Sequence, residues 1–281
     1  MYGRKTFLNV KYMTDCYYYK ELSRDGSGVF NKSVDCTYVL IMHESPREES
    51  IIKTLERTHT TSTVVLQYNY GYKKCDKKLV KNAPNYDLSH AYKTAFKHAL
   101  DRGYKRILVL EDDCEFDERI HDTTITEDIN TFILERQPDI YTLGTPICIP
   151  SPLDVIRGAN HQLLLFNTSA HAVIYSEKFM KYNLKNVPML GHIDFETNAH
   201  LSKYTYKKPI AYQKYYATDN ALFGWGCMYH VLNVLIFKPL QLDTKVQPGF
   251  DNGKRICDIC SIVLFVLFVL LVLRSQLGLN Q

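Results

Sequence analysis

Three consecutive acidic residues, Glu111, Asp112 and Asp113, directly follow a short apolar run and constrain what this chain can fold into. The run, residues 107–110, has the length and branching of a strand buried on both faces. Adjacent carboxylates at the end of such a strand repel one another and lose hydration, so a cation or a dense set of donors usually holds them. A hard divalent ion, Mg²⁺ or Mn²⁺, is the simplest candidate because it prefers oxygen ligands. The alternative is that the triplet is only the polar end of a strand.

The segment before this strand has the pattern of a helix. Its apolar residues recur at helical spacing, and they are Leu88, Ala91, Tyr92, Ala95, Phe96, Ala99 and Leu100. Asp87 is the expected N-cap, and Gly103 is expected to end the helix. Open α/β sheets bind ligands outside the carboxyl ends of their strands, so we expect the acidic triplet to lie at a ligand site.

This helix and strand resemble glycosyltransferase family 25, which contains bacterial lipooligosaccharide galactosyltransferases and collagen galactosyltransferases. In that family a Ser-His pair opens a helix, and a hydrophobic strand and a Leu-Glu-Asp-Asp motif follow. Ser89 and His90 fit the pair, and residues 110–113 fit the motif with the right separation. The resemblance covers about residues 36–213 and is strong only between residues 88 and 115. It implies an α/β fold of the GT-A type, a UDP-sugar donor, and Mn²⁺ or Mg²⁺ as the cofactor.

The resemblance also implies roles for individual residues at the end of the strand. Glu111 and Asp113 would serve the metal and the nucleotide, whereas Asp112 would hold the strand end or the ribose. Ser89 and His90 would lie at the nucleotide, although hydrogen bonding at a helix end is the structural alternative for both.

A loop after the first expected strand is a further point of resemblance. In the family this loop contains an asparagine, basic residues and an arginine near the nucleotide, and Arg47 matches the end of that pattern. Ile41, His43 and Glu44 depart from the pattern. From the match at Arg47 alone, the resemblance implies that Arg47 contacts the nucleotide. The alternative is a solvated arginine at the start of a helix.

A second pair of acids, Asp194 and Glu196, follows Gly191 and His192. An inverting transferase needs one carboxylate to deprotonate the acceptor hydroxyl as that hydroxyl attacks the anomeric carbon. Asp194 matches the downstream acid of the family by order and context, so we expect Asp194 to be the general base and Glu196 the reserve. N-capping of a helix is the structural alternative for Asp194.

Apolar runs and helical periodicities alternate along the chain, and they predict a mostly parallel, Rossmann-like sheet flanked by helices. The expected strands are residues 36–42, 63–67, 107–110, 139–144, 163–166 and 172–175, and the expected helices are 48–57, 88–100, 125–136 and 176–182. Tyr17, Tyr18 and Tyr19 could form an added strand. Residues 146–159, rich in proline and turn residues, are expected to form a mobile rim of the site.

A C-terminal stretch, residues 259–273, consists almost entirely of Ile, Val, Leu and Phe. The stretch has about fifteen residues, fewer than the roughly 20 that normally span a bilayer. A short stretch can still span, because flanking arginines can snorkel and a bilayer can thin. We therefore expect a single-pass tail anchor, with a buried core segment as the alternative. Lys254 and Arg255 favour a cytosolic catalytic domain, whereas a luminal domain would make the sequons at Asn31 and Asn167 usable.

The expected organisation has four parts. They are an N-terminal extension (1–35), a GT-A-like domain (36–247), a linker (248–258) and a transmembrane helix (259–273). A formal charge of +4 on 281 residues is too small to imply a nucleic-acid partner. The eight cysteines are mostly isolated and are expected to be free thiols, and only Cys257 and Cys260 lie close together, where they suggest palmitoylation.

The expected function is metal-dependent transfer of galactose or glucose from a UDP-hexose donor to a glycan or glycoprotein acceptor, with inversion. Two other classes stay open. The chain could be an inactive, membrane-tethered protein of the same fold that binds a glycan or a partner. It could also be a metal-dependent phosphohydrolase, since carboxylates and Mg²⁺ serve that chemistry too. Trp225, which follows Asp219 and Asn220, could stack on a sugar ring.

Overall fold

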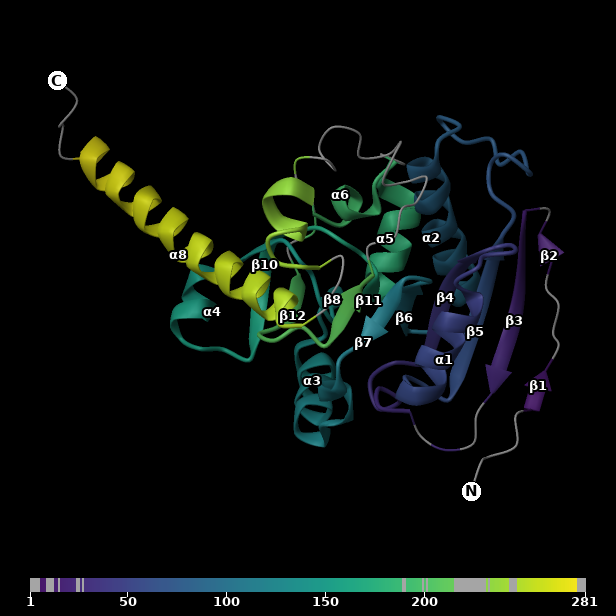
Figure 1. Ribbon diagram of the computed structural model, residues 1–281. Helices are drawn as coiled ribbons and strands as arrows, with labels where there is room; N and C mark the ends of the chain where they lie inside the picture. Colours follow the sequence, from purple (N-terminus) through teal and green to yellow (C-terminus); the bar gives the residue numbers. More distant parts are fainter. Residues whose placement is uncertain are drawn as a thin grey trace.

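The computed structural model describes residues 6–8, 13–14, 16–23, 26, 28–188, 191–198, 200, 202–214, 231, 233–242 and 247–276. One mixed sheet of eleven strands forms its centre, and helices cover both faces (Figure 1). The position around Asp219, Asn220 and Trp225 lies outside the described residues.

The elements have the following bounds. The strands of the large sheet are β1 (Thr6–Leu8), β2 (Met13–Thr14), β3 (Tyr17–Ser23), β4 (Cys36–Met42), β5 (Thr63–Asn69), β6 (Arg106–Glu111), β8 (Ile140–Thr142), β9 (Cys148–Pro150), β10 (His161–Asn167), β11 (Ala172–Ser176) and β12 (Lys203–Tyr206). A second sheet pairs β7 (Cys114–Phe116) with β13 (Ala211–Gln213). The helices are α1 (Glu48–Thr58), α2 (Pro84–Asp101), α3 (Thr123–Arg136), α4 (Pro152–Ile156), α5 (Glu177–Asn186), α6 (Ile193–Asn198) and α8 (Gly249–Gln276), with shorter turns η1 (Glu118–His121) and η3 (Asn233–Phe237).

Three neighbouring strands, β5, β4 and β6, run parallel as the sequence predicts, and helical crossovers connect them. Beyond β6 the sheet differs from the prediction of a mostly parallel sheet, because β11 pairs antiparallel with both β6 and β8. Strand β12 pairs parallel with β8, and β10 pairs antiparallel with β12. The architecture is therefore mixed α/β.

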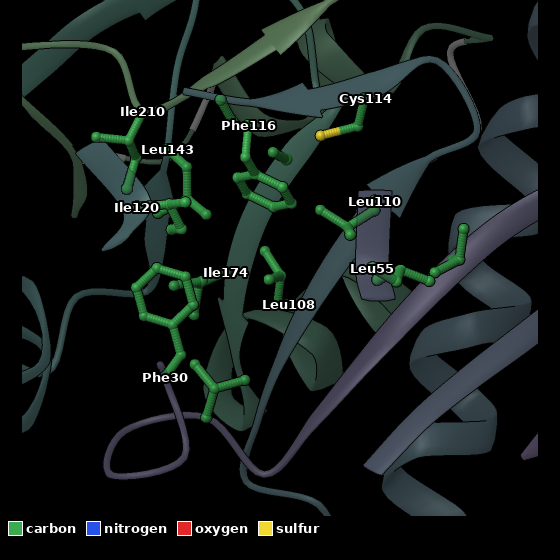
Figure 2. Packing of buried hydrophobic residues seen from close by; sticks show 14 of the residues in the cluster. Phe30, Leu55, Leu108, Leu110, Cys114, Phe116, Ile120, Leu143, Ile174 and Ile210 are labelled. Atoms are coloured by element: carbon green, nitrogen blue, oxygen red, sulfur yellow. The ribbon is translucent and has the colours of Figure 1, made fainter. Parts of the chain in front are cut away.

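The central strand β6 is buried on both faces, as its apolar run predicts. Leu108 and Leu110 pack into a core with residues of α1 and α3, while Ile107 and Val109 face a second core formed with α2 and α5. Figure 2 shows Leu108 beside Ile174 of β11, and Leu110 nearer Leu55 of α1. Side chains alternate along a strand, so Glu111 continues the row that faces α2.

The N-terminal part of the chain adds strands to the edge of the sheet, as suggested for the tyrosine run. Strand β3 pairs antiparallel with β5, and a disulfide joins Cys16, next to β3, to Cys75 in the loop after β5. The prediction of free thiols is wrong for this pair. The two cysteines are 59 residues apart in sequence, and only the pairing of β3 with β5 brings them together.

Helix α8 contains both the expected linker and the expected membrane segment, because residues 249–276 form one continuous helix. Its buried residues recur on one stripe and end at Ser261. Residues 146–159 were expected to be a mobile rim, but they form β9 and α4, which pack against α8 (Figure 1). Cys257 is buried beside Cys148, so of the two cysteines proposed for palmitoylation only Cys260 is exposed.

One helix of the described chain, α8, is long and apolar enough to cross a membrane, and its apolar window is only 11% buried. Figure 1 shows this helix projecting from the globular part toward the C-terminus.

Replacing Cys16 with Ser should lower the free energy of unfolding by about 2–4 kcal/mol, because the disulfide restrains a long loop in the unfolded chain. Thermal unfolding without reductant measures the change, and Cys260→Ser, at an exposed free thiol, is the control with little expected effect. Equal melting temperatures for the two variants would mean that the disulfide does not form.

Candidate functional site

The acidic triplet lies at the carboxyl end of β6, and it is held inside the protein. Asp112 and Asp113 are each 8% exposed, and Glu111 is half-buried. Since β4 runs parallel to β6, the loop after β4 reaches the same edge of the sheet. That geometry is the one expected of a ligand site in an open α/β sheet.

The loop after β4 supplies partners for Asp112. The Arg47 guanidinium Nη2 lies 3.1 Å from Asp112 Oδ1, and the Ser45 hydroxyl donates to Asp112 Oδ2 at 3.0 Å. Arg47 Nη1 also lies 3.7 Å from Asp113 Oδ2. Burial raises the pKa of Asp112, and Arg47 opposes that shift by favouring the charged form. The structure thus brings Arg47 to the acidic triplet, while its role toward a nucleotide stays a prediction.

Asp113 has one satisfied and one unsatisfied carboxylate oxygen. The Gln213 side-chain amide donates to Oδ2 at 3.2 Å, and the Lys214 backbone N–H donates to the Asp113 carbonyl at 2.9 Å. Asp113 Oδ1 is buried without a hydrogen-bond partner in the described chain. Burial, with a smaller effect of the Asp112 charge, raises the pKa of Asp113 to about 7. An unpaired buried carboxylate oxygen is costly, so it points to a partner that the protein itself does not supply.

Glu111 faces α2, as the alternation along β6 requires. The Tyr92 hydroxyl lies 2.8 Å from Glu111 Oε1 and 2.7 Å from the Ala170 carbonyl. Burial raises the pKa of Glu111 well above its usual value, and the charges of Asp113 and Asp194 add to that shift. Two elements far apart in sequence, β6 and α6, therefore place their acids close enough to interact.

Asp194 lies within the first turn of α6 and is buried, so the alternative of an N-cap is wrong. Burial raises the pKa of Asp194 to about 6, while the Ser169 backbone N–H and the Lys203 charge act in the opposite direction. Its Oδ1 has no hydrogen-bond partner within the described chain. Ser169 has a φ of 69°, an uncommon conformation for a residue with a side chain, and it lies in the tight 168–171 connection.

A glycine brings α6 against the first turn of α2. Gly191 has a φ of 78°, and a Cβ at this position would meet the Tyr86 ring at 2.6 Å. Glu196 is 1% exposed and acts electrostatically on Lys93 and Tyr175, so it faces the interior. His192, which directly precedes α6, has its ring Nε2 3.4 Å from the Asn85 side-chain Nδ2.

Among the residues that the structure describes, neither Ser89 nor His90 makes a hydrogen bond or an ion pair with the acidic triplet. The His90 Nδ1 lies 2.7 Å from the Tyr17 hydroxyl, and the two rings stack. The expected N-cap is also wrong, because α2 begins at Pro84, which is well suited to a first helical position. Asp87 instead accepts a hydrogen bond from the Tyr72 backbone N–H at 3.0 Å.

These residues could hold a metal ion only if a bound ligand supplied some of the atoms that coordinate it. Within the described ranges, no group of three or more His, Cys, Asp or Glu side chains could hold a metal. The unpartnered Oδ1 of Asp113, with Glu111 nearby, fits an ion that takes one or two carboxylates. Mg²⁺ is commonly bound in that way, with substrate phosphates as its other ligands.

Sequence reasoning missed four partners of the acids, namely Ser45, Tyr92, Gln213 and Lys214. Gln213 and Lys214 reach Asp113 because β13 pairs with β7, and no local pattern predicts that long-range pairing. Gly144 permits this approach, since a Cβ there would meet the Ala211 carbonyl oxygen at 2.0 Å.

No family model matches this chain, and no curated protein matches it. Among solved structures it is similar to A197 from STIV, with a TM-score of 0.39 and 11% identity over 65% of this chain and 86% of that chain. It is also similar to a protein from Bacillus anthracis assigned as a glucose-1-phosphate thymidylyltransferase, solved in complex with a sucrose. That TM-score is 0.31, with 12% identity over 59% of this chain and 65% of that chain, just under two thirds. TM-scores below 0.5 carry no conclusion about activity, so family 25 membership stays a prediction.

Asp113→Asn should stabilise the protein above pH 7 by roughly 1–3 kcal/mol, because it removes a buried carboxylate whose pKa is raised to about 7. A raised folded pKa means that the native state loses stability as pH rises from about 4 to 7. The gain should therefore shrink as pH falls toward 4, which thermal unfolding across that range measures. Asp101→Asn, at an exposed carboxylate paired with Lys97, is the control with little expected effect. A destabilised Asp113→Asn variant at pH 8 would contradict the account.

Proposed function

We propose that this chain is a glycosyltransferase with a GT-A-like domain, which transfers a hexose from a UDP-sugar to a glycan or glycoprotein acceptor. The observation that carries the proposal is the buried, unpartnered Oδ1 of Asp113 at the carboxyl end of β6. The other carboxylate oxygen of Asp113, Oδ2, lies 3.7 Å from Arg47 Nη1. The resemblance to family 25 supports the choice of donor, because it rests on the same acids.

The donor diphosphate would lie among the charges at this strand end. Mg²⁺ or Mn²⁺, when bound by Asp113 and Glu111, would neutralise the negative charge that develops on the departing diphosphate. Arg47 approaches the triplet from the loop after β4 and offers a cation to phosphate oxygens, whereas the Lys214 ammonium pairs with Glu115. Asp112 is held by Arg47 and Ser45, so its role is to fix the loop after β4.

Asp194 is the proposed general base. Its pKa of about 6 means that most of this carboxylate is ionised at neutral pH, yet it is more basic than an ordinary aspartate. A base with that pKa is suited to take the proton of an acceptor hydroxyl during in-line displacement of the diphosphate. Glu196, two residues later in α6, stays the reserve.

The activity is tested with UDP-galactose and UDP-glucose in the presence of Mn²⁺, by measuring UDP release with and without glycan acceptors. Asp113→Ala should abolish release, and Asp194→Asn should lower kcat about 10²-fold or more with little change in donor KM. Glu127→Gln, at a surface ion pair with Lys32, should have no effect. UDP release that persists unchanged in Asp113→Ala would contradict the proposal.

One observation favours a second candidate, a protein of the same fold that binds without turnover. In the loop after β4, His43 contacts Tyr18 and Glu44 pairs with Lys74, where the family has an asparagine and basic residues. Donor binding without UDP release, over a broad set of acceptors, would favour this candidate.

The disulfide and α8 together support one membrane topology. We propose that α8 anchors the chain and that the globular domain lies on the oxidising side of the membrane, because structural disulfides are rare in the cytosol. This revises the cytosolic placement that Lys254 and Arg255 favoured.

The topology is tested in cells through the sequons at Asn31 and Asn167. A luminal domain should carry a glycan that an endoglycosidase removes, and the double change to Gln should abolish the shift. Asn31 is half-buried and bonded to Ser62, while Asn167 is buried, so a glycan must be added before folding. An unglycosylated chain with Cys16 and Cys75 reduced would place the domain in the cytosol.

A further inference from the structure

A cleft of about 250 Å³ lies where α8 meets the globular domain. Its walls come from the end of α4, the start of β10, the segment 207–209 and one side of α8 between residues 251 and 258. Four cationic and two acidic side chains line it, and they are Lys207, Lys208, Lys254, Arg255, Asp251 and Asp258. The cleft is separate from the acidic triplet, whose residues do not line it.

Part of this charge is neutralised within the protein. Lys254 is buried, donates to the Gln162 side-chain oxygen at 2.6 Å and pairs with Asp258. Asp251 accepts from the Arg119 guanidinium at 2.8 Å. Both acids of the cleft therefore already have cationic partners.

Three cations remain, namely Lys207, Lys208 and Arg255. None of them makes an ion pair with another residue of the described chain, and Lys208 and Arg255 are exposed. Lys208 also acts electrostatically on Asp251. Three positive charges without an ion pair around one concave site favour a ligand with several anionic oxygens, as in a phosphate group.

The position of the cleft along α8 indicates the source of such a ligand. The stripe by which α8 packs on the domain ends at Ser261, whose hydroxyl donates to the Pro150 carbonyl at 2.5 Å. Arg255 precedes Ile259, the first residue of the apolar stretch, by one turn, or about 6 Å. Head-group regions are roughly 5–8 Å thick on each side of a bilayer, so Arg255 lies at their depth.

The neighbouring surface also suits a membrane. Helix α4 packs beside α8 and exposes two large apolar side chains, Leu153 and Ile156, the latter 60% exposed. Leu165 of β10 is exposed as well. Apolar side chains next to a basic site are the combination by which peripheral surfaces enter the interface.

We propose that this cleft binds the phosphate of an anionic phospholipid head group in the leaflet that the domain faces. Lys207 and Lys208 contact the phosphate from the domain, and Arg255 contacts it from the anchor helix. The bound lipid thereby joins the two parts of the chain and fixes how the domain sits on the bilayer. The proposal rests on the membrane anchor of the proposed function.

The test uses the purified full-length protein in neutral detergent, titrated with phosphatidylglycerol and followed by native mass spectrometry. Changing Lys207, Lys208 and Arg255 together to Gln should weaken lipid binding roughly 100-fold, since each basic residue near a membrane surface contributes about 1 kcal/mol. A control variant with the same loss of charge changes Lys53, Lys81 and Lys185, three exposed lysines elsewhere on the surface, to Gln.

Three outcomes are distinguished. Weaker lipid binding in the cleft variant alone, with unchanged melting temperature, supports the proposal. Equal lipid binding by the cleft variant and the control variant overturns the proposal. Inorganic phosphate that displaces the lipid at concentrations as low as those of the lipid also overturns it, because the ligand would then be a soluble phosphate. Flotation with phosphatidylcholine vesicles tests the anchor separately. If the unmodified protein does not float with these neutral vesicles, the proposed membrane anchor is wrong, whatever the cleft binds.

Discussion

Burial of adjacent carboxyl groups at the end of β6 is the constraint on which the rest of the site depends. Three acids in a row would lie in solvent if the strand ended at the surface, but here β4, β11 and β13 enclose them. The protein offsets part of the desolvation through Arg47, Ser45 and Gln213. It leaves Asp113 Oδ1 without a partner, and that residual cost is the physical reason to expect a cationic ligand there.

The sequence predicted the elements whose signals are local. The apolar run of β6 and the acids behind it were predicted, because alternation of apolar runs with helical periodicity defines a strand and its end. Asp194 was expected from the family resemblance alone, and its role as general base stays a prediction. The helix expected over residues 176–182 is α5, which Ser176 caps by accepting from the Phe179 N–H at 3.1 Å. The start of α2 was missed because Pro84 is a stronger start signal than Asp87.

Features that depend on distant pairing could not be predicted. The antiparallel pairing of β11 with β6 and β8 joins segments far apart in the chain, and the approach of Gln213 to Asp113 follows from the β7–β13 register. The segment before β13 links the site to the cleft beside α8. Lys208 lines the cleft beside α8, and five residues of extended chain, at most about 17 Å, separate it from Gln213.

The central claim is that the acids at the end of β6 bind a divalent ion together with a nucleotide diphosphate. Calorimetric titration of UDP into the purified protein, with and without Mn²⁺, tests it most directly. The account predicts heat of binding only when Mn²⁺ is present, and no binding by the Asp113→Ala variant in either condition. Equal affinity for UDP with and without Mn²⁺, unchanged in that variant, would contradict it.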